Sequence, residues 1–451
     1  MILQPIKLFI IGDGFSAAIS TVHLLRQGIN PKSIAIIGER SLGKGNAYDC
    51  NTPSFRLNVR EDLPIIFSED PLHFARWAKE RLNDPQAKRE AGFFYRRSDF
   101  GKYTKELVSD QLQGRPLNQI KGFAKRIQKN GSTWNITLQS GEVVLAQNII
   151  LATGNASPIW PCPVNNKRQS KFQSHLIENP WTGGYLKDIH VNDSVILLGG
   201  GLTALDAVSA LVEQNHRGKV LVIAPRAIFP PSQAPWSRQN EPNWPNPLTP
   251  SNLVRFMRNY LPDSPTDSSE WQCAWEELRP DINCIWQEFT DHQRRILMKR
   301  FGWLWNLYRF RASPQSIEAY QQLKQNQQIG FCCGRAQQIE VGEEGIKVDL
   351  GNGKRVTGQW LINCTGVARD ALLDQFISDD LALPDSLNKS IAVNHQFAVL
   401  QPTKEAYSNL WMIGPATMGS IGDVVAASAI AKQAEQLARK LRVKSFAKEI
   451  A

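Results

Sequence analysis

Two apolar runs, each ending at glycines and each followed by a helical pattern, stand out along the chain. Residues 7–11 (KLFII) and 194–198 (SVILL) place apolar side chains at successive positions, which is typical of strands buried on both faces. Residues 15–25 and 202–214 carry apolar side chains at helical spacing. The pattern therefore predicts two strand–turn–helix units that lie far apart in the chain.

The first turn has the glycine pattern of a dinucleotide-binding loop. Gly12 permits the tight turn, Gly14 lets the backbone approach a pyrophosphate, and Ala17 keeps the helix close to the strand. A second apolar strand, 33–39, ends at Glu39, whose carboxylate can accept hydrogen bonds from a ribose diol. These parts predict a bound adenine dinucleotide, and the alternative is a strand–helix turn without a ligand.

The second turn repeats the pattern with Gly199, Gly201 and Ala204. The strand that follows, 219–227, carries Arg226 near its end, where the first unit has a glutamate. An arginine there can pair with the 2′-phosphate of NADPH, whereas a carboxylate would repel that group. The position favours NADPH over NADH, and the alternative for Arg226 is a solvated surface residue.

A second repeated feature supports this layout. Residues 133–154 and 345–366 each predict a hairpin followed by an apolar strand that closes on Thr-Gly, at Thr153-Gly154 and Thr365-Gly366. A glycine at the strand end lets a dinucleotide pass close to the backbone. The residues therefore predict a flavoprotein with two dinucleotides, FAD at the first turn and NADPH at the second.

Composition and charge add limits on the class of protein. The chain has 451 residues and a net charge of +10, with its lysines and arginines scattered rather than clustered. Nothing in it matches a nucleic-acid-binding motif, a signal peptide or a membrane span, and no metal site is implied. The seven cysteines include no C-x-x-C pair. We therefore expect a cytoplasmic protein whose partner is a small-molecule substrate, with the oligomeric state left open.

Motifs along the whole chain resemble those of one bacterial family. The likeness begins with the GKGNAY segment (43–48), continues through residues 56–77 and 93–103, and closes with LWMIGPAT (410–417). Beyond the glycine turns it is carried by Gly43, Gly45, Ala47, Tyr48, Leu57, Asn58, Val59, Asp70, Pro71, His73, Phe74, Trp77, Arg96, Arg97, Gly101 and Tyr103. The chain resembles the FAD–NAD(P)-binding oxidoreductases among the flavoproteins with two dinucleotide-binding domains, which are related to flavin-containing monooxygenases.

Two segments depart from the family pattern. Residues 308–314 (YRFRASP) lack the two histidines that the family has there, and residues 422–431 (GDVVAASAIA) keep an acid at Asp423 but lose a proline, a glutamate and an arginine. The cofactor motifs are intact. The resemblance therefore implies the cofactors and leaves the substrate undetermined.

The resemblance implies an α/β fold in which an NADPH domain is inserted into a discontinuous FAD domain. The expected boundaries are 1–157 for the first part of the FAD domain, 158–230 for the NADPH domain, 231–330 for a helical insert and 331–451 for the return to the FAD domain. Seven of the thirteen tryptophans lie in the insert: Trp236, Trp244, Trp271, Trp275, Trp286, Trp303 and Trp305. Such aromatic side chains favour core packing, with a substrate region as the alternative.

Two residues are candidates for catalysis. Asn58 resembles the asparagine that flavin-containing monooxygenases place over the flavin, although the spacing differs by about one residue; the alternative is a capping asparagine. His175 stands where that superfamily keeps a histidine, without the preceding glycine; the alternative is a structural histidine.

The function these features predict is that of an NADPH-dependent FAD monooxygenase that uses O₂ to hydroxylate a small metabolite. The alternatives are a reductase or dehydrogenase without oxygen insertion and a non-catalytic flavoprotein that senses nucleotides. The residues expected to contact the cofactors are Gly12, Gly14, Phe15, Ser16, Ala17, Glu39, Arg40, Ala47, Tyr48, Asn58, Thr153, Gly154, Gly199, Gly201, Leu202, Thr203, Arg226, Thr365, Gly366, Gly414 and Asp423.

Overall fold

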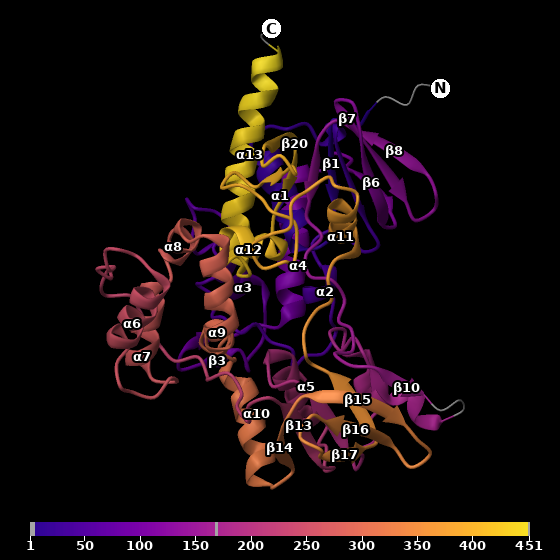
Figure 1. Ribbon diagram of the computed structural model, residues 1–451, viewed down its shortest axis with the longest axis vertical. Coiled ribbons are helices and arrows are strands. Elements are labelled where there is room, and N and C mark those ends of the chain that lie inside the picture. Colours follow the sequence, from indigo (N-terminus) through magenta and orange to yellow (C-terminus); the bar gives the residue numbers. More distant parts are fainter. Residues whose placement is uncertain (1–4, 167–169, 450–451) are drawn as a thin grey trace.

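The first domain is built on a sheet whose strands come from both ends of the chain (Figure 1). The computed structural model describes residues 5–166 and 170–449. The sheet contains, in spatial order, β19 (Ala398–Leu400), β20 (Ala406–Met412), β9 (Ile149–Leu151), β1 (Leu8–Ile11), β2 (Ile34–Gly38) and β5 (Asn118–Lys121). The inner strands β1 and β9 are buried at every position, as their unbroken apolar runs predict.

The C-terminal segment completes this domain. Strand β20 pairs in parallel with β9, with Trp411 opposite Ile150. Helix α13 (Ala427–Glu449) packs against α1 (Phe15–Arg26), and α4 (Arg97–Leu112) packs on α1 as well. The predicted discontinuous domain is therefore present. A meander of β6 (Ala124–Asn130), β7 (Thr133–Leu138) and β8 (Val143–Ala146) forms the expected hairpin before β9.

Short elements complete this half of the molecule. They are α2 (Gly45–Tyr48), α3 (His73–Arg81), β3 (Lys88–Arg89), β4 (Gly92–Phe93), α11 (Ala371–Ser378) and α12 (Met418–Ile421).

The second domain has its own parallel sheet. Its strands are, in spatial order, β11 (Leu176–Ile177), β18 (Trp360–Asn363), β12 (Val195–Leu198), β13 (Val220–Ala224) and β14 (Ile329–Cys333). Helices α5 (Leu202–Glu213) and α10 (Pro314–Gln325) pack together beside it. A smaller sheet of β10 (Val164–Asn166), β15 (Ala336–Val341), β16 (Ile346–Leu350) and β17 (Arg355–Gly358) contains the second predicted hairpin.

The expected return to the first domain at residue 331 is wrong. Strand β14 pairs with β13, and β18 pairs with β12, so the second domain continues through residue 363. Parallel strands are joined by crossover connections, and here the connection from β13 to β14 contains the whole insert. The chain must therefore come back to the second sheet before it can return to the first.

The insert between β13 and α10 is helical, as predicted. It contains α6 (Pro250–Tyr260), α7 (Ser269–Leu278), α8 (Ile282–Glu288) and α9 (Asp291–Arg309). Thr249, Ser268 and Thr290 accept hydrogen bonds from first-turn backbone N–H groups and so begin α6, α7 and α9. The rings of Trp271 and Trp275 stack with centroids 5.3 Å apart, so these tryptophans serve packing.

The two domains and the insert occupy separate regions of the molecule (Figure 1). The first domain, with both chain ends, occupies one end of the long axis, and the second domain occupies the other (Figure 1). The insert projects from one flank, and α9 leads from it toward α10 and the second domain. Among the described residues, no helix is long and apolar enough to cross a membrane.

Candidate functional site

The turn between β1 and α1 is shaped to hold a dinucleotide. Gly12 has φ +126°, and a Cβ there would overlap the backbone carbonyl of Ala152 at the end of β9. Gly14 begins α1 without any side-chain cap, so the first N–H groups of the helix are available to phosphate oxygens. The hydroxyl of Thr153 is buried without a partner, and a Cβ at Gly154 would meet nothing within 4 Å. These groups fit the pyrophosphate of FAD.

The GKGNAY loop closes one side of this turn. A Cβ on Gly45 would lie 2.7 Å from the Cα of Gly14, so the two backbones approach as closely as two glycines allow. Ala47 and Tyr48 belong to α2 directly after this contact, and the Tyr48 ring packs edge-on against Phe15. Phe15 and Tyr48 therefore pack against each other beside the turn, and their contacts with the cofactor stay a prediction.

Asp13 positions the loop at the acidic end of β2, a contact that sequence reasoning missed. Glu39 follows the strand and is exposed, as a ribose-binding carboxylate must be. The carboxylate of Asp13 accepts a hydrogen bond from the backbone N–H of Arg40 at 2.8 Å. A Cβ at Gly38 would lie 2.7 Å from the Asp13 Cγ, so a glycine is needed there. Asp13 thus fixes the loop that presents Glu39, and an aspartate between Gly12 and Gly14 was the available signal.

The turn between β12 and α5 repeats the same construction. Gly199 has φ +116°, and a Cβ there would lie 2.6 Å from the carbonyl carbon of Cys364 at the end of β18. Gly201 begins α5 without a side-chain cap, and Leu202 and Thr203 form the first turn of that helix. Cβ atoms at Gly201 and Gly366 would meet nothing within 4 Å. This turn also fits a pyrophosphate, and its assignment to NADPH stays a prediction.

Other predicted contacts have partners within the protein. The Thr365 hydroxyl donates to the Asn363 side chain at 2.6 Å. The backbone N–H of Gly414 donates to Gln433 at 2.8 Å, and Gly414 lies against Ser16. The Arg226 guanidinium lies 3.5 Å from the ring centroid of Trp303 on α9. The insert therefore reaches the end of β13, where a 2′-phosphate would be read.

An ion pair with a buried carboxylate joins the two dinucleotide-binding domains. Arg97, at the start of α4, contacts Asp206 on α5 at 2.6 Å, and the Asp206 side chain is only 8% exposed. Burial raises the pKa of the Asp206 carboxyl to about 6, although Arg97 acts in the opposite direction. Sequence reasoning missed this pair, because an aspartate inside an apolar helix gives no indication of a partner 109 residues away.

We expect comparison with the Asp206→Asn variant to show that the raised pKa of Asp206 makes the stability of the protein depend on pH. The folded pKa lies above the unfolded value of 3.8, so the folded state binds the proton more tightly. The stabilisation that this proton gives the folded protein is complete below pH 3.8 and is lost as the pH rises through 6. The stability of the wild type relative to Asp206→Asn should fall by up to about 3 kcal/mol between pH 4 and pH 7. Urea unfolding at a series of pH values measures it, and a difference that rises with pH would contradict it.

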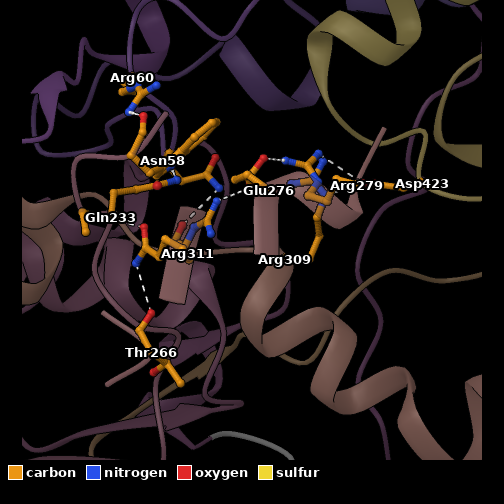
Figure 2. A network of polar contacts seen from close by, with 12 residues as sticks. Asn58, Arg60, Gln233, Thr266, Glu276, Arg279, Arg309, Arg311 and Asp423 are labelled. Atoms are coloured by element: carbon orange, nitrogen blue, oxygen red, sulfur yellow. Dashed lines mark hydrogen bonds and ion pairs between the residues drawn. The ribbon is translucent and has the colours of Figure 1, made fainter. Parts of the chain in front are cut away.

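Asn58 lies where the first domain meets the insert (Figure 2). Its side-chain amide donates to the backbone carbonyl of Arg311 at 3.2 Å. Its own backbone carbonyl accepts a hydrogen bond from the Gln233 side chain at 2.9 Å. Asn58 is therefore held in one orientation by residues from both ends of the insert, which a simple capping asparagine would not require.

His175 has the contacts of a structural residue. Its ring stacks on Trp360 with centroids 3.9 Å apart and planes 2° from parallel. Its Nδ1 lies 3.1 Å from the carbonyl oxygen of Gln359. Both partners flank or begin β18 in the second domain, and no contact among the described residues joins His175 to Asn58. These contacts favour the structural alternative.

A group of charged residues, most of them buried, extends from the neighbourhood of Asn58 to Asp423 (Figure 2). The Arg309 Nε contacts the Asp423 carboxylate at 2.6 Å, and Arg279 contacts the same oxygen at 3.2 Å. Arg279 also pairs with Glu276 at 2.8 Å, and Glu276 pairs with Arg311. The carboxylate oxygen that meets both arginines is thus turned toward the insert, so the FAD contact expected for Asp423 stays a prediction. We call Glu276, Arg279, Arg309, Arg311 and Asp423 the arginine cluster.

Comparisons with known proteins agree with this geometry. Residues 9–156 match a family model described as FAD-NAD(P)-binding. The fold is similar to that of L-lysine 6-monooxygenase from Pseudomonas syringae, with a TM-score of 0.67, 14% identity, and 98% of this chain and 99% of that chain covered. The ornithine N-hydroxylase of Kutzneria sp. 744 gives a TM-score of 0.66 at 12% identity, over 98% and 100% of the two chains. No curated protein matches the sequence.

A second kind of flavoenzyme shares the fold less closely. Thioredoxin reductase from Lactococcus lactis gives a TM-score of 0.53 at 11% identity, over 97% of this chain and 99% of that chain. The chain therefore has the fold of the flavoproteins with two dinucleotide-binding domains, as its motifs predict, and its N-terminal third is an FAD–NAD(P)-binding domain.

Proposed function

We propose that the protein is an NADPH-dependent flavin monooxygenase that hydroxylates a small molecule with dioxygen. The observation that carries the proposal is the pair of uncapped helices at Gly14 and Gly201, because one chain then offers two separate places for a pyrophosphate. When both cofactors are bound, NADPH supplies the hydride and FAD supplies the oxygen chemistry. The protein's own task is to position the cofactors and to control access of water.

Specific residues divide that task. The turn at Gly14, the Thr153 hydroxyl and the exposed Glu39 would hold FAD, and the turn at Gly201 with Arg226 would hold NADPH. The Arg97–Asp206 pair fastens α4 of the first domain to α5 of the second and so fixes how the two places face each other. Asn58, fixed by Arg311, would keep a hydrogen-bonding amide beside the flavin and help exclude water.

Two further observations favour oxygen insertion over plain electron transfer. The fold resembles the lysine and ornithine hydroxylases more closely than the thioredoxin reductase, as their TM-scores of 0.67, 0.66 and 0.53 record. The sequence also has no C-x-x-C pair with which to pass electrons to a disulfide. The reductase remains the alternative outcome of the test.

The test follows oxygen rather than NADPH alone. FAD-loaded protein, NADPH and ¹⁸O₂ would be incubated with a panel of small amines, amino acids and carboxylic acids. We expect NADPH oxidation to require O₂ and one substrate to acquire a single ¹⁸O atom, detected by mass spectrometry. NADPH oxidation that proceeds equally without oxygen through an artificial electron acceptor, with no labelled product from any compound, would instead establish a reductase.

The role of Asn58 can be tested in the same assay. We expect Asn58→Ala to send a larger share of the consumed NADPH to hydrogen peroxide and a smaller share to product, because the fixed amide is lost. Asn148→Ala is the matched control, since Asn148 is half-buried and makes a similar amide bond, to the carbonyl of Lys7 at 2.8 Å, beside the first sheet. Equal peroxide shares in the two variants would remove Asn58 from the mechanism.

A further inference from the structure

The arginine cluster contains more positive than negative charge. Three guanidinium groups face two carboxylates, and no other carboxylate among the described residues is paired with these arginines. The side chains of Arg309 and Arg311 are 5% and 2% exposed and that of Arg279 is 23% exposed, so solvent screens the excess charge only on the Arg279 side. A buried, unbalanced charge is strongly unfavourable unless a counter-charge joins it.

Several donors of the cluster also lack partners. Nη2 of Arg309, Nε and Nη1 of Arg311 and Nε of Arg279 are buried without a hydrogen bond to any described residue. On the acceptor side, only Oδ1 of Asp423 is left unpaired within the cluster. Buried water would satisfy such nitrogens, but water would not supply the missing negative charge. Donors and charge therefore indicate the same missing partner, which is an anion.

The titration behaviour of the cluster is consistent with this reading. Burial lowers the pKa of Arg311 to about 10, while Glu276 acts to raise it. The pKa of Arg309 is lowered as well, first by burial and then by the neighbouring Arg279. The pKa of Glu276 lies below its ordinary value, because the arginines overcome the effect of its burial. At neutral pH all three arginines and both acids are charged, and the excess of one positive charge persists.

The position of the arginine cluster indicates whether a cofactor or another molecule would supply the anion. Arg311 holds the Asn58 amide through its backbone carbonyl, and its guanidinium lies 5.9 Å from the ring centroid of Trp236. The indole N–H of Trp236 is another buried donor without a partner. The dinucleotide phosphates already have the uncapped helices at Gly14 and Gly201. An acid group bound here would thus belong to a molecule lying next to Asn58.

We propose that Arg309 and Arg311, with Arg279, form a buried binding site for a carboxylate or similar acid group, and that the substrate is therefore an anion or carries one. A planar guanidinium presents paired N–H groups that match the two oxygens of a carboxylate. A compound whose only charged groups are amines would be repelled. The assignment to the substrate rests on the proposed monooxygenase function, whereas the anion site itself does not.

The unpartnered nitrogens are closed to solvent, so the acid group reaches them only when the insert opens locally. Binding is measured without NADPH and without turnover, which keeps it independent of the oxygen assay. FAD-loaded protein would be titrated calorimetrically with acetate, succinate, inorganic phosphate and, as a cationic probe, cadaverine, at constant ionic strength. We expect saturable binding of at least one of the anions at a single site, and none of cadaverine.

Two variants separate the unpaired charge from general effects of removing an arginine. Arg311→Met leaves two arginines facing two acids, and we expect anion binding to weaken by at least about tenfold. Arg60→Met is the matched control, because Arg60 stacks on the same Trp236 at 4.3 Å but is already paired with Asp62 at 2.8 Å. That variant should bind the anion as the wild type does.

Each result decides the proposal. Absence of saturable anion binding by the wild type overturns it, even if Arg311→Met fails to fold. Equal binding by wild type and Arg311→Met overturns it as well. Binding that persists in protein saturated with FAD and NADP⁺ supports a substrate acid group. Anion binding to the FAD-loaded protein that saturating NADP⁺ abolishes would assign the charge to a cofactor phosphate and remove the inference about the substrate.

Discussion

Glu276→Gln is expected to lower the free energy of unfolding by about 3–5 kcal/mol, because it leaves buried arginines without their carboxylate. Glu276 is 2% exposed and pairs with both Arg279 and Arg311. A neutral amide at this position still accepts one hydrogen bond, but it removes one of only two negative charges that face three arginines. The loss should therefore be far larger than that of an ordinary polar substitution.

Urea unfolding of the two proteins at pH 7 measures the effect. Glu318→Gln is the matched control, because Glu318 forms a similar pair with Arg89 at 2.6 Å but its side chain is 54% exposed. Solvent screening should keep the control within about 1 kcal/mol of the wild type. If Glu276→Gln unfolds at the same urea concentration as the control, the cluster is not under the charge imbalance inferred from its geometry.

The excess of arginines over carboxylates also links the predicted stability loss of Glu276→Gln to the proposed anion site. Adding an anion that binds the folded protein stabilises it in proportion to the logarithm of the ligand concentration. Acetate or succinate, whichever binds, should accordingly raise the unfolding midpoint of the wild type and leave that of Arg311→Met nearly unchanged. The unfolding midpoint and the calorimetric titration would then measure the same excess of positive charge independently.

Local patterns in the sequence predicted the parts of the fold that local physics determines. The strand–turn–helix units at Gly12 and Gly199 follow from apolar runs that end at glycines, and both turns are present with positive φ. The two hairpins follow from alternating strands around a turn. Each of these features needs only neighbouring residues, so one sequence suffices to indicate it.

Pairing between distant segments could not be predicted in the same way. The boundary at residue 331 failed because β14 must be matched to β13 across the whole insert, and no property of residues 329–333 alone names that partner. Arg97 and Asp206 meet only because two domains pack together. Sequence separation of this size leaves the partner of a charged residue open.

The arginine cluster shows a further limit. Residues 308–314 stood out because they lack the histidines of a family pattern, so the segment indicated a loss rather than a site. Its arginines became informative only when the structure placed Arg309, at the end of α9, against Asp423 and Arg311, just beyond α9, against Glu276. The departure from the family pattern thus drew attention to this segment, while the contacts of its arginines required the three-dimensional arrangement.

Two glycines of the second turn should respond in opposite ways to the same added methyl group. Gly199→Ala places a Cβ 2.6 Å from the carbonyl carbon of Cys364 at φ +116°, so the backbone must shift. We expect a stability loss of at least about 1–3 kcal/mol. Gly201 has φ −95° and open space around the position of a Cβ. Gly201→Ala should therefore lose no more than about 1 kcal/mol, which is the cost of alanine in place of glycine where a helix begins.

We expect NADP⁺ binding, by contrast, to be weakened in Gly201→Ala, the variant that folds with nearly normal stability. In Gly201→Ala the methyl group occupies the space through which a pyrophosphate approaches the start of α5, so we expect NADP⁺ to bind at least about tenfold more weakly. The FAD content should be unchanged, because the first turn lies in the other domain. Calorimetric titration with NADP⁺ and the absorbance of bound flavin measure both quantities. A Gly201→Ala protein that binds NADP⁺ as tightly as the wild type would show that this turn, despite its open helix end, is not where the second dinucleotide binds.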